Sequence, residues 1–199
     1  MTRGTRTERG PVHALMAAVV TTVLAAGLTG PAAVAAPGTT SSYRAAATLR
    51  CSMRTAAPVA FSPAVSAGPR TVTARGTVNL NECTSPNGRR KNIRSGTLTV
   101  HGSGRATCTR VTGVRGSATI TWYSGPGRTG RVVGRSAVSP AAAGAGGYTP
   151  LDSFLSGRIA SGPMAGQRIT GRAVPTTSVS SCHGQGLRSV GLRGTATVR

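Results

Sequence analysis

The chain has 199 residues and a very unequal balance of charge, with 24 Lys and Arg against three Asp and Glu, for a net charge of +21. A charge of this size favours anionic partners over cationic ones. The shortage of carboxylates also argues against glycosidase chemistry, which needs two carboxyl groups near one another.

The first 35 residues have the pattern of a secretory signal peptide. Three arginines precede an apolar run over residues 14–28, and Ala33 and Ala35 supply the small residues of a cleavage site. We therefore expect cleavage after Ala35 and a secreted, extracellular protein. Because the apolar run is shorter than the ~20 residues of a spanning helix, we expect no membrane span in the mature form.

The remaining residues divide into a flexible lead-in (36–47) and a single domain (48–199). The mature form keeps 21 cations and two acids, so its net charge is +19. Leu, Ile, Val and Phe make up 27 of its 164 residues, a share of about 16% that is typical of disordered chains. Two features favour folding nevertheless. The apolar residues alternate along discrete segments, and disulfides would stabilise the fold by about 2–4 kcal/mol each.

All four cysteines fall in the exported part of the chain, at Cys51, Cys83, Cys108 and Cys182. An even number in an oxidising compartment indicates two disulfides, for which the sequence permits three connectivities. We favour Cys51–Cys83 with Cys108–Cys182, since sequential pairing would hold each half of the domain separately. No C-x-x-C pair supports a zinc site, so we expect no metal and no cofactor.

The mature chain contains a series of short segments in which apolar and polar residues alternate, as in antiparallel strands. Residues 56–69 contain three prolines and are interpreted as an edge or a loop. Residues 140–147 form an Ala/Gly linker, and residues 176–186 form a Ser-rich loop. The expected strands cover residues 47–54, 70–80, 96–102, 105–111, 114–123, 131–138, 151–160, 167–174 and 187–199.

These segments predict an all-β fold, an antiparallel β-sandwich or barrel of about eight or nine short strands with two disulfides. The clearest strand is 114–123, in which Val114, Gly116, Ala118, Ile120 and Trp122 share one face. Similar five-residue patterns recur at Gly76, Gly96, Gly116 and Gly194. The segments between them differ, so we interpret the pattern as one type of strand used repeatedly rather than as a solenoid.

The order of these features resembles a group of small secreted proteins of actinomycetes, an uncharacterised all-β family with a signal peptide. The resemblance rests on CTSPNG at 83–88, TITW at 119–122, the hairpin S-G-x-x-A-G at 161–166 and the late Cys182. It covers roughly residues 48–199. It implies the fold and export, and it supplies no catalytic residue.

Catalytic patterns are weak, and we expect no enzymatic activity. Residues 125–130 satisfy G-x-G-x-x-G, but a strand rather than a helix is expected to follow, so we interpret them as a hairpin turn. The histidines His101 and His183 are expected at a strand surface and in a loop. With Asp152 and many serines they supply the residue types of a hydrolase, but there is no G-x-S-x-G motif.

The strongest interaction candidate is a basic loop that contains Arg89, Arg90, Lys91 and Arg94. Arginine guanidinium groups pair with phosphate through two hydrogen bonds, so the loop predicts association with anionic wall polymers or other polyanions. It contains no aromatic residues on which bases could stack, so we expect no sequence-specific nucleic-acid binding. A loop that only keeps the protein soluble is the equally weighted alternative.

A second hypothesis is a protein-binding module, either an inhibitor or a carrier of a small ligand. It would use an exposed loop, and the candidates are residues 140–150 and 178–185. The sequence does not separate this hypothesis from polyanion binding.

Overall fold

The computed structural model describes residues 46–140 and 155–199, and this part of the chain is all-β. The expected signal peptide, most of the lead-in and the linker after Pro140 lie outside the described residues. Two 3-10 turns, η1 (Pro126–Arg128) and η2 (Ser180–His183), accompany the strands. The strands are β1 (Leu49–Val65), β2 (Arg70–Thr84), β3 (Ser95–Ala106), β4 (Val111–Tyr123), β5 (Val132–Pro140), β6 (Leu155–Ser161), β7 (Arg168–Pro175), β8 (Leu187–Val190) and β9 (Leu192–Val198).

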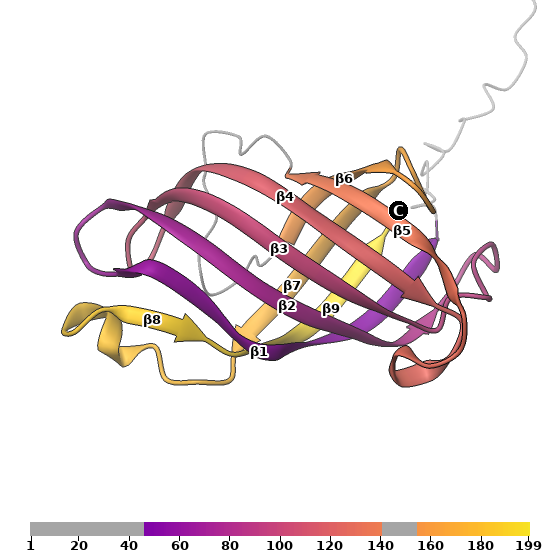
Figure 1. The fold of residues 1–199 in the computed structure, drawn as a ribbon, viewed down its shortest axis with the longest axis horizontal. Helices are drawn as coiled ribbons and strands as arrows, with labels where there is room; N and C mark the ends of the chain where they lie inside the picture. The colour runs from indigo at the N-terminus through magenta and orange to yellow at the C-terminus, as the bar shows by residue number, and fades with distance from the viewer. Residues whose placement is uncertain (1–45, 141–154) are drawn as a thin grey trace, which may run out of the picture. The chain divides into compact units, whose positions relative to one another are not determined.

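The strands form a closed antiparallel barrel, which decides between the two architectures that the sequence left open. Eight strands follow one another in the order β2-β3-β4-β5-β6-β7-β9-β1, and pairing of β1 with β2 closes the ring. The ninth strand, β8, lies outside this ring and pairs with the second half of β1 (Figure 1). The ring is continuous at β1–β2, whereas β4 pairs with β5 only over Ala118–Tyr123, so the start of β4 has no β5 partner in the described part of the chain.

Strand β1 is much longer than expected, because residues 56–65 continue it instead of forming a loop. The chain accommodates Pro58 through register shifts between Thr55 and Ala60, where a strand bulges and a ladder N–H is not required. The first half of β1 pairs with β9 and the second half with β8, while β2 pairs along both halves.

Two further expectations about strands are wrong. Residues 105–111 are not one strand, because Thr107 and Arg110 close a turn, with the Thr107 N–H donating to the Arg110 carbonyl at 2.8 Å. Residues 187–199 are two strands that separate at Gly191. There Thr177 and Thr55 accept the N–H groups of Gly191 and Leu192 through their hydroxyl oxygens, so side chains replace the ladder bonds.

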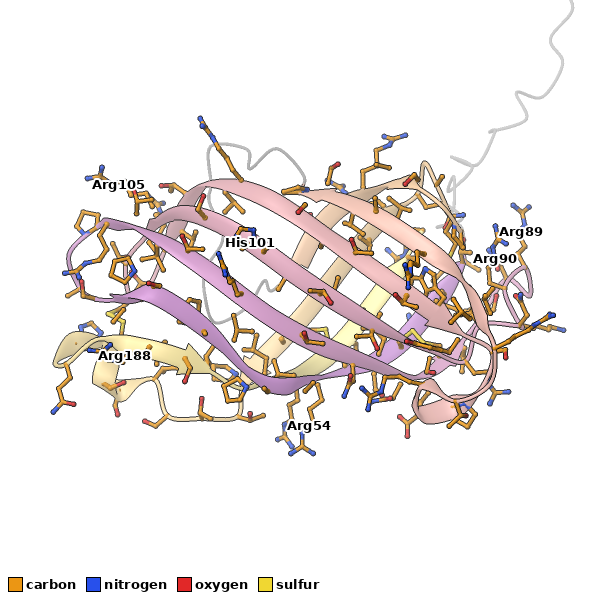
Figure 2. The ribbon with its side chains drawn as sticks, viewed as in Figure 1. Arg54, Arg89, Arg90, His101, Arg105 and Arg188 are labelled. Atoms are coloured by element: carbon orange, nitrogen blue, oxygen red, sulfur yellow. A yellow bond between two sulfur atoms is a disulfide. The ribbon has the colours of Figure 1, made fainter. Side chains whose placement is uncertain are left out.

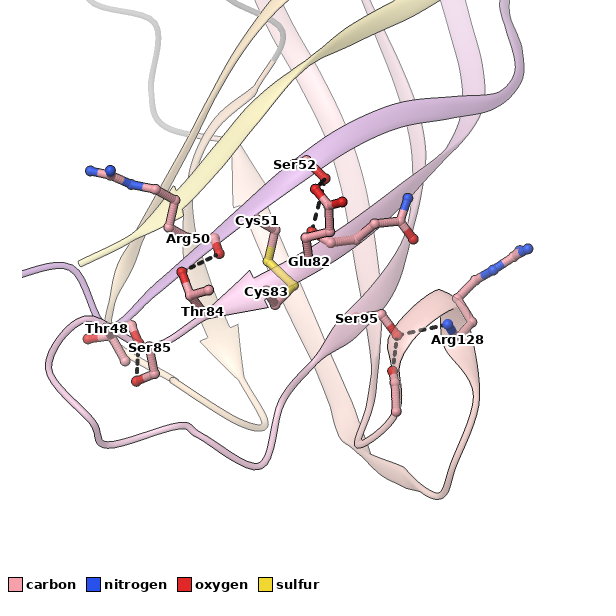
Figure 3. The surroundings of a disulfide bond; sticks show 12 residues. Thr48, Arg50, Cys51, Ser52, Glu82, Cys83, Thr84, Ser85, Ser95 and Arg128 are labelled. Atoms are coloured by element: carbon pink, nitrogen blue, oxygen red, sulfur yellow. Dashed lines mark hydrogen bonds between the residues drawn. A yellow bond between two sulfur atoms is a disulfide. The ribbon is translucent and has the colours of Figure 1, made fainter.

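The two disulfides are the predicted ones. Cys51–Cys83 joins the neighbouring strands β1 and β2 (Figure 3). Cys108–Cys182 joins the β3–β4 turn to η2, across 74 residues of sequence.

One end of the barrel, here called the packed end, is filled by large side chains. Leu80, Leu98, Ile120 and Trp122 are fully buried there, in agreement with the expected inward face of residues 114–123. Two turns also contribute to this end, since the β2–β3 loop buries Ile93 and the β6–β7 turn buries Met164. Other buried side chains of the core include Leu49, Val78, Ile159, Ile169 and Val198.

A buried hydrogen-bond chain fixes Trp122 at the packed end. The Trp122 indole N–H donates to Ser136 Oγ at 2.9 Å, and the Ser136 hydroxyl donates to the Pro163 carbonyl at 2.6 Å. Ser136 itself is fully buried. The chain therefore joins β4, β5 and the β6–β7 turn, and it satisfies polar groups that would otherwise be costly to bury.

Replacing Ser136 with alanine should destabilise the barrel by about 1–3 kcal/mol, because the Trp122 N–H and the Pro163 carbonyl would both lose a buried partner. Urea unfolding followed by fluorescence of Trp122, the sole tryptophan of the chain, measures the change. Ser139→Ala, at an exposed position of the same strand, is the control and should change stability by less than about 0.5 kcal/mol. Equal effects of the two substitutions would contradict this assignment.

Candidate functional site

The opposite end of the barrel, here called the hollow end, contains a cavity of about 420 Å³. Its wall is mostly apolar and includes Val72 and Ala74 of β2, Val100 of β3, Ala118 of β4 and Val138 of β5. Small-molecule sites in proteins typically measure about 300–1,000 Å³ and are mainly apolar. The cavity is therefore large enough to hold a compact ligand.

The cavity results from a gradient in the size of the inward residues. Along β4, the inward positions that line the cavity are Val114, Gly116 and Ala118, and those at the packed end are Ile120 and Trp122. In the antiparallel neighbour β3, Leu98 lies toward the packed end, and the smaller Val100, Gly102 and Gly104 line the cavity. Large side chains thus fill one half of the interior, and small ones leave the other half open.

At two of the small positions, only glycine fits, because the backbones of the two strands lie close together. Gly102 of β3 and Gly116 of β4 are direct cross-strand partners. Gly116 has a φ of +150°, and a Cβ added there would meet the His101 carbonyl oxygen and the Gly102 Cα. A side chain at this pair would push the strands apart, so the local backbone itself keeps this part of the wall free of side chains.

The segment around η2 and strand β8 contribute another part of the cavity wall. Val179 and Cys182 come from this segment, and Leu187 and Val190 come from β8. Cys108–Cys182 holds η2 to the β3–β4 turn. A backbone bond from the Gly186 N–H to the Ser181 carbonyl, at 2.8 Å, shapes the return of the chain toward β8.

Both histidines are among the residues that line the cavity, but they come from different elements. His101 lies on β3 between its cross-strand partners Arg75 and Ser117, and its side chain is exposed on the outer wall (Figure 2). His183 lies at the end of η2, on the rim of the cavity. Asp152 lies outside the described residues. Within residues 46–140 and 155–199, no group of three or more His, Cys, Asp and Glu could hold a metal ion.

The predicted basic loop lies at the packed end, away from the cavity. Arg89, Lys91 and Arg94 are exposed, whereas Arg90 is half-buried; Figure 2 shows Arg89 and Arg90 on this loop. The loop has an ordered backbone, because the Arg90 N–H donates to Ser85 Oγ at 3.0 Å. The exposed cationic side chains of this loop therefore extend from an ordered backbone.

Residues 125–130 form the expected hairpin turn, which contains η1 and leads into β5. Ser95 of β3 holds this turn from the side (Figure 3). Its hydroxyl donates to the Gly125 carbonyl at 2.6 Å, and its oxygen accepts the Arg128 N–H at 2.8 Å. Gly127 and Gly130 adopt positive φ angles in this turn, so the glycines of the motif are explained by the turn conformation.

The cavity was not predicted from the sequence. The signal that could have revealed it was the progression Gly116, Ala118, Ile120, Trp122, which was used only to assign a buried face. A cavity can be predicted from these side-chain sizes only when it is also known that the sheet closes and that neighbouring strands place their small residues at the same end.

No family model matches the chain, and neither a curated protein nor a solved structure matches it. In the described part of the chain, no helix is long and apolar enough to cross a membrane.

Removing the Cys108–Cys182 disulfide by Cys108→Ala with Cys182→Ala should destabilise the protein by about 2–4 kcal/mol. The loosening should concentrate in residues 176–191, because η2 then loses its covalent link to the β3–β4 turn. Hydrogen exchange resolved by peptide measures this. Faster exchange in residues 176–191 than around Trp122 is the expected pattern, and uniform acceleration throughout the barrel would contradict it.

Proposed function

We propose that this protein is a secreted, non-enzymatic binding protein that carries one compact apolar molecule in the hollow end of its barrel. The observation that supports this most strongly is the apolar cavity of about 420 Å³. Eight-stranded barrels are just wide enough either to be filled by side chains or to hold one small ligand. This barrel has both arrangements, one at each end.

The composition of the wall indicates the chemistry of the ligand. Val72, Val100 and Val138 offer only aliphatic surface, so the buried part of the ligand is a hydrocarbon body. Polar side chains lie at the rim, where Ser180 and His183 of η2 contribute to the lining. A polar group of the ligand would therefore face this rim rather than the interior.

A series of linear alcohols tests this function through displacement of a neutral naphthyl dye. Each added methylene buried in the cavity contributes about 0.8 kcal/mol, so affinity should rise about fourfold per carbon until the cavity is full, and then level off. Dye fluorescence measures the competition. Affinity that does not depend on chain length would contradict an apolar interior site.

Filling the cavity provides the matched control. Ala74→Phe places a ring inside the barrel, whereas Thr73→Phe places the same ring on the outer wall one residue earlier. The first variant should weaken dye binding about tenfold or more, equal to about 1.4 kcal/mol. The second should leave binding unchanged. Equal losses in both would place the dye outside the cavity.

We also propose association with anionic wall polymers or other polyanions through the basic loop. The support is the exposure of Arg89, Lys91 and Arg94 on an ordered loop. In this proposal the loop and the cavity act independently, because they occupy opposite ends of the barrel.

A salt gradient on immobilised heparin tests the second proposal, because binding that depends on charge weakens steeply as salt rises. Replacing Arg89, Lys91 and Arg94 with glutamine should lower the eluting salt concentration more than the same change at Arg105, Arg110 and Arg115. The two triple variants alter the net charge equally. If both triple variants lower the eluting salt concentration equally, heparin binds the positive surface as a whole and not the basic loop in particular.

A further inference from the structure

A second charged feature lies on the outer wall of the barrel, away from both ends. Arg54 of β1, Arg193 of β9 and Arg172 of β7 come from three consecutive strands of the ring. Arg54 and Arg193 are direct cross-strand partners. Arg172 pairs with Thr195, two residues along β9 from Arg193, so it is a diagonal neighbour of Arg193. All three side chains are exposed.

This arrangement is unfavourable for the protein alone, because like charges directly opposite each other in an antiparallel pair are destabilising. Within residues 46–140 and 155–199, the structure gives none of the three guanidinium groups an ion-pair partner. Figure 2 shows Arg54 projecting from the outer wall into solvent. An anion held between the guanidinium groups would relieve the repulsion.

The three arginines surround a groove of about 980 Å³ that also has uncharged hydrogen-bonding groups. Ser52, Asn81 and Thr195 contribute a hydroxyl, an amide and a second hydroxyl to its lining. Val174 also lines the groove and is 53% exposed, which provides a small apolar surface opposite Arg193.

The groove contains one negative charge, on Glu82. Its carboxylate accepts a hydrogen bond from the Ser52 hydroxyl at 3.1 Å (Figure 3). Three cations and one anion leave the groove with a local charge of +2.

We propose that this groove binds a phosphate monoester through Arg54, Arg172 and Arg193. A monoester carries a charge of about −1.5 to −2 at pH 7, which matches the local charge, whereas a diester carries only one negative charge. Guanidinium groups bind phosphate oxygens through paired, charge-assisted hydrogen bonds. The organic group of the ester would lie against Val174.

The test titrates phenyl phosphate, with inorganic phosphate and diphenyl phosphate as comparisons, into the full barrel at a fixed ionic strength of about 0.15 M. Arginine side-chain Nε–H signals, recorded by nuclear magnetic resonance, report the binding site. Signals of Arg54, Arg172 and Arg193 should shift with one saturable affinity. Phenyl phosphate should bind tightest and diphenyl phosphate weakest.

Arg193→Gln and Arg172→Gln should each weaken phenyl phosphate binding about tenfold or more. Arg75→Gln removes the same charge from the outer wall of β2 and should leave affinity within about twofold. Equal weakening by Arg75→Gln, shifts that do not saturate, or equal affinity for monoester and diester would each overturn the proposal. Ala74→Phe should not affect this binding, so the outcome is independent of the cavity.

Discussion

Closure of the sheet between β1 and β2 is the constraint on which the rest of this structure depends. Strand β1 pairs with β2 on one side and with β9 and then β8 on the other. The Cys51–Cys83 disulfide fixes the same β1–β2 pair covalently. Without this seam the eight strands would form an open sheet with two free edges, and the inward residues would not enclose a common interior.

Within the closed ring, the size of the inward side chains determines what each end of the barrel can do. Leu80, Leu98 and Trp122 fill the packed end, where Ser136 satisfies the indole N–H. Valine, alanine and glycine leave the hollow end open. Tight packing at one end stabilises the barrel and offsets the open space at the other end. The cations lie at outward positions, where they do not affect the packing of either end.

The alternation of residues was sufficient to predict an all-β fold, most strand positions and the buried face of residues 114–123. Pairing of the cysteines in sequence order was also correct. Strand β1 was predicted too short because the three prolines of residues 56–69 were interpreted as an edge or a loop, whereas bulges accommodate Pro58 within the strand. The cavity and the opposed Arg54 and Arg193 depend on closure and register, which bring together residues more than 130 positions apart and which alternation alone does not specify.

Within residues 46–140 and 155–199, the side chains leave the hollow end as an open apolar space. Xenon is the most direct probe of this space, since apolar cavities in proteins bind this gas. A crystal of the protein pressurised with xenon should show xenon inside the barrel among Val72, Val100 and Val138. The Ala74→Phe variant should show reduced occupancy at the same position. A crystal in which no xenon enters the barrel, and in which side chains occupy that space, would contradict the account.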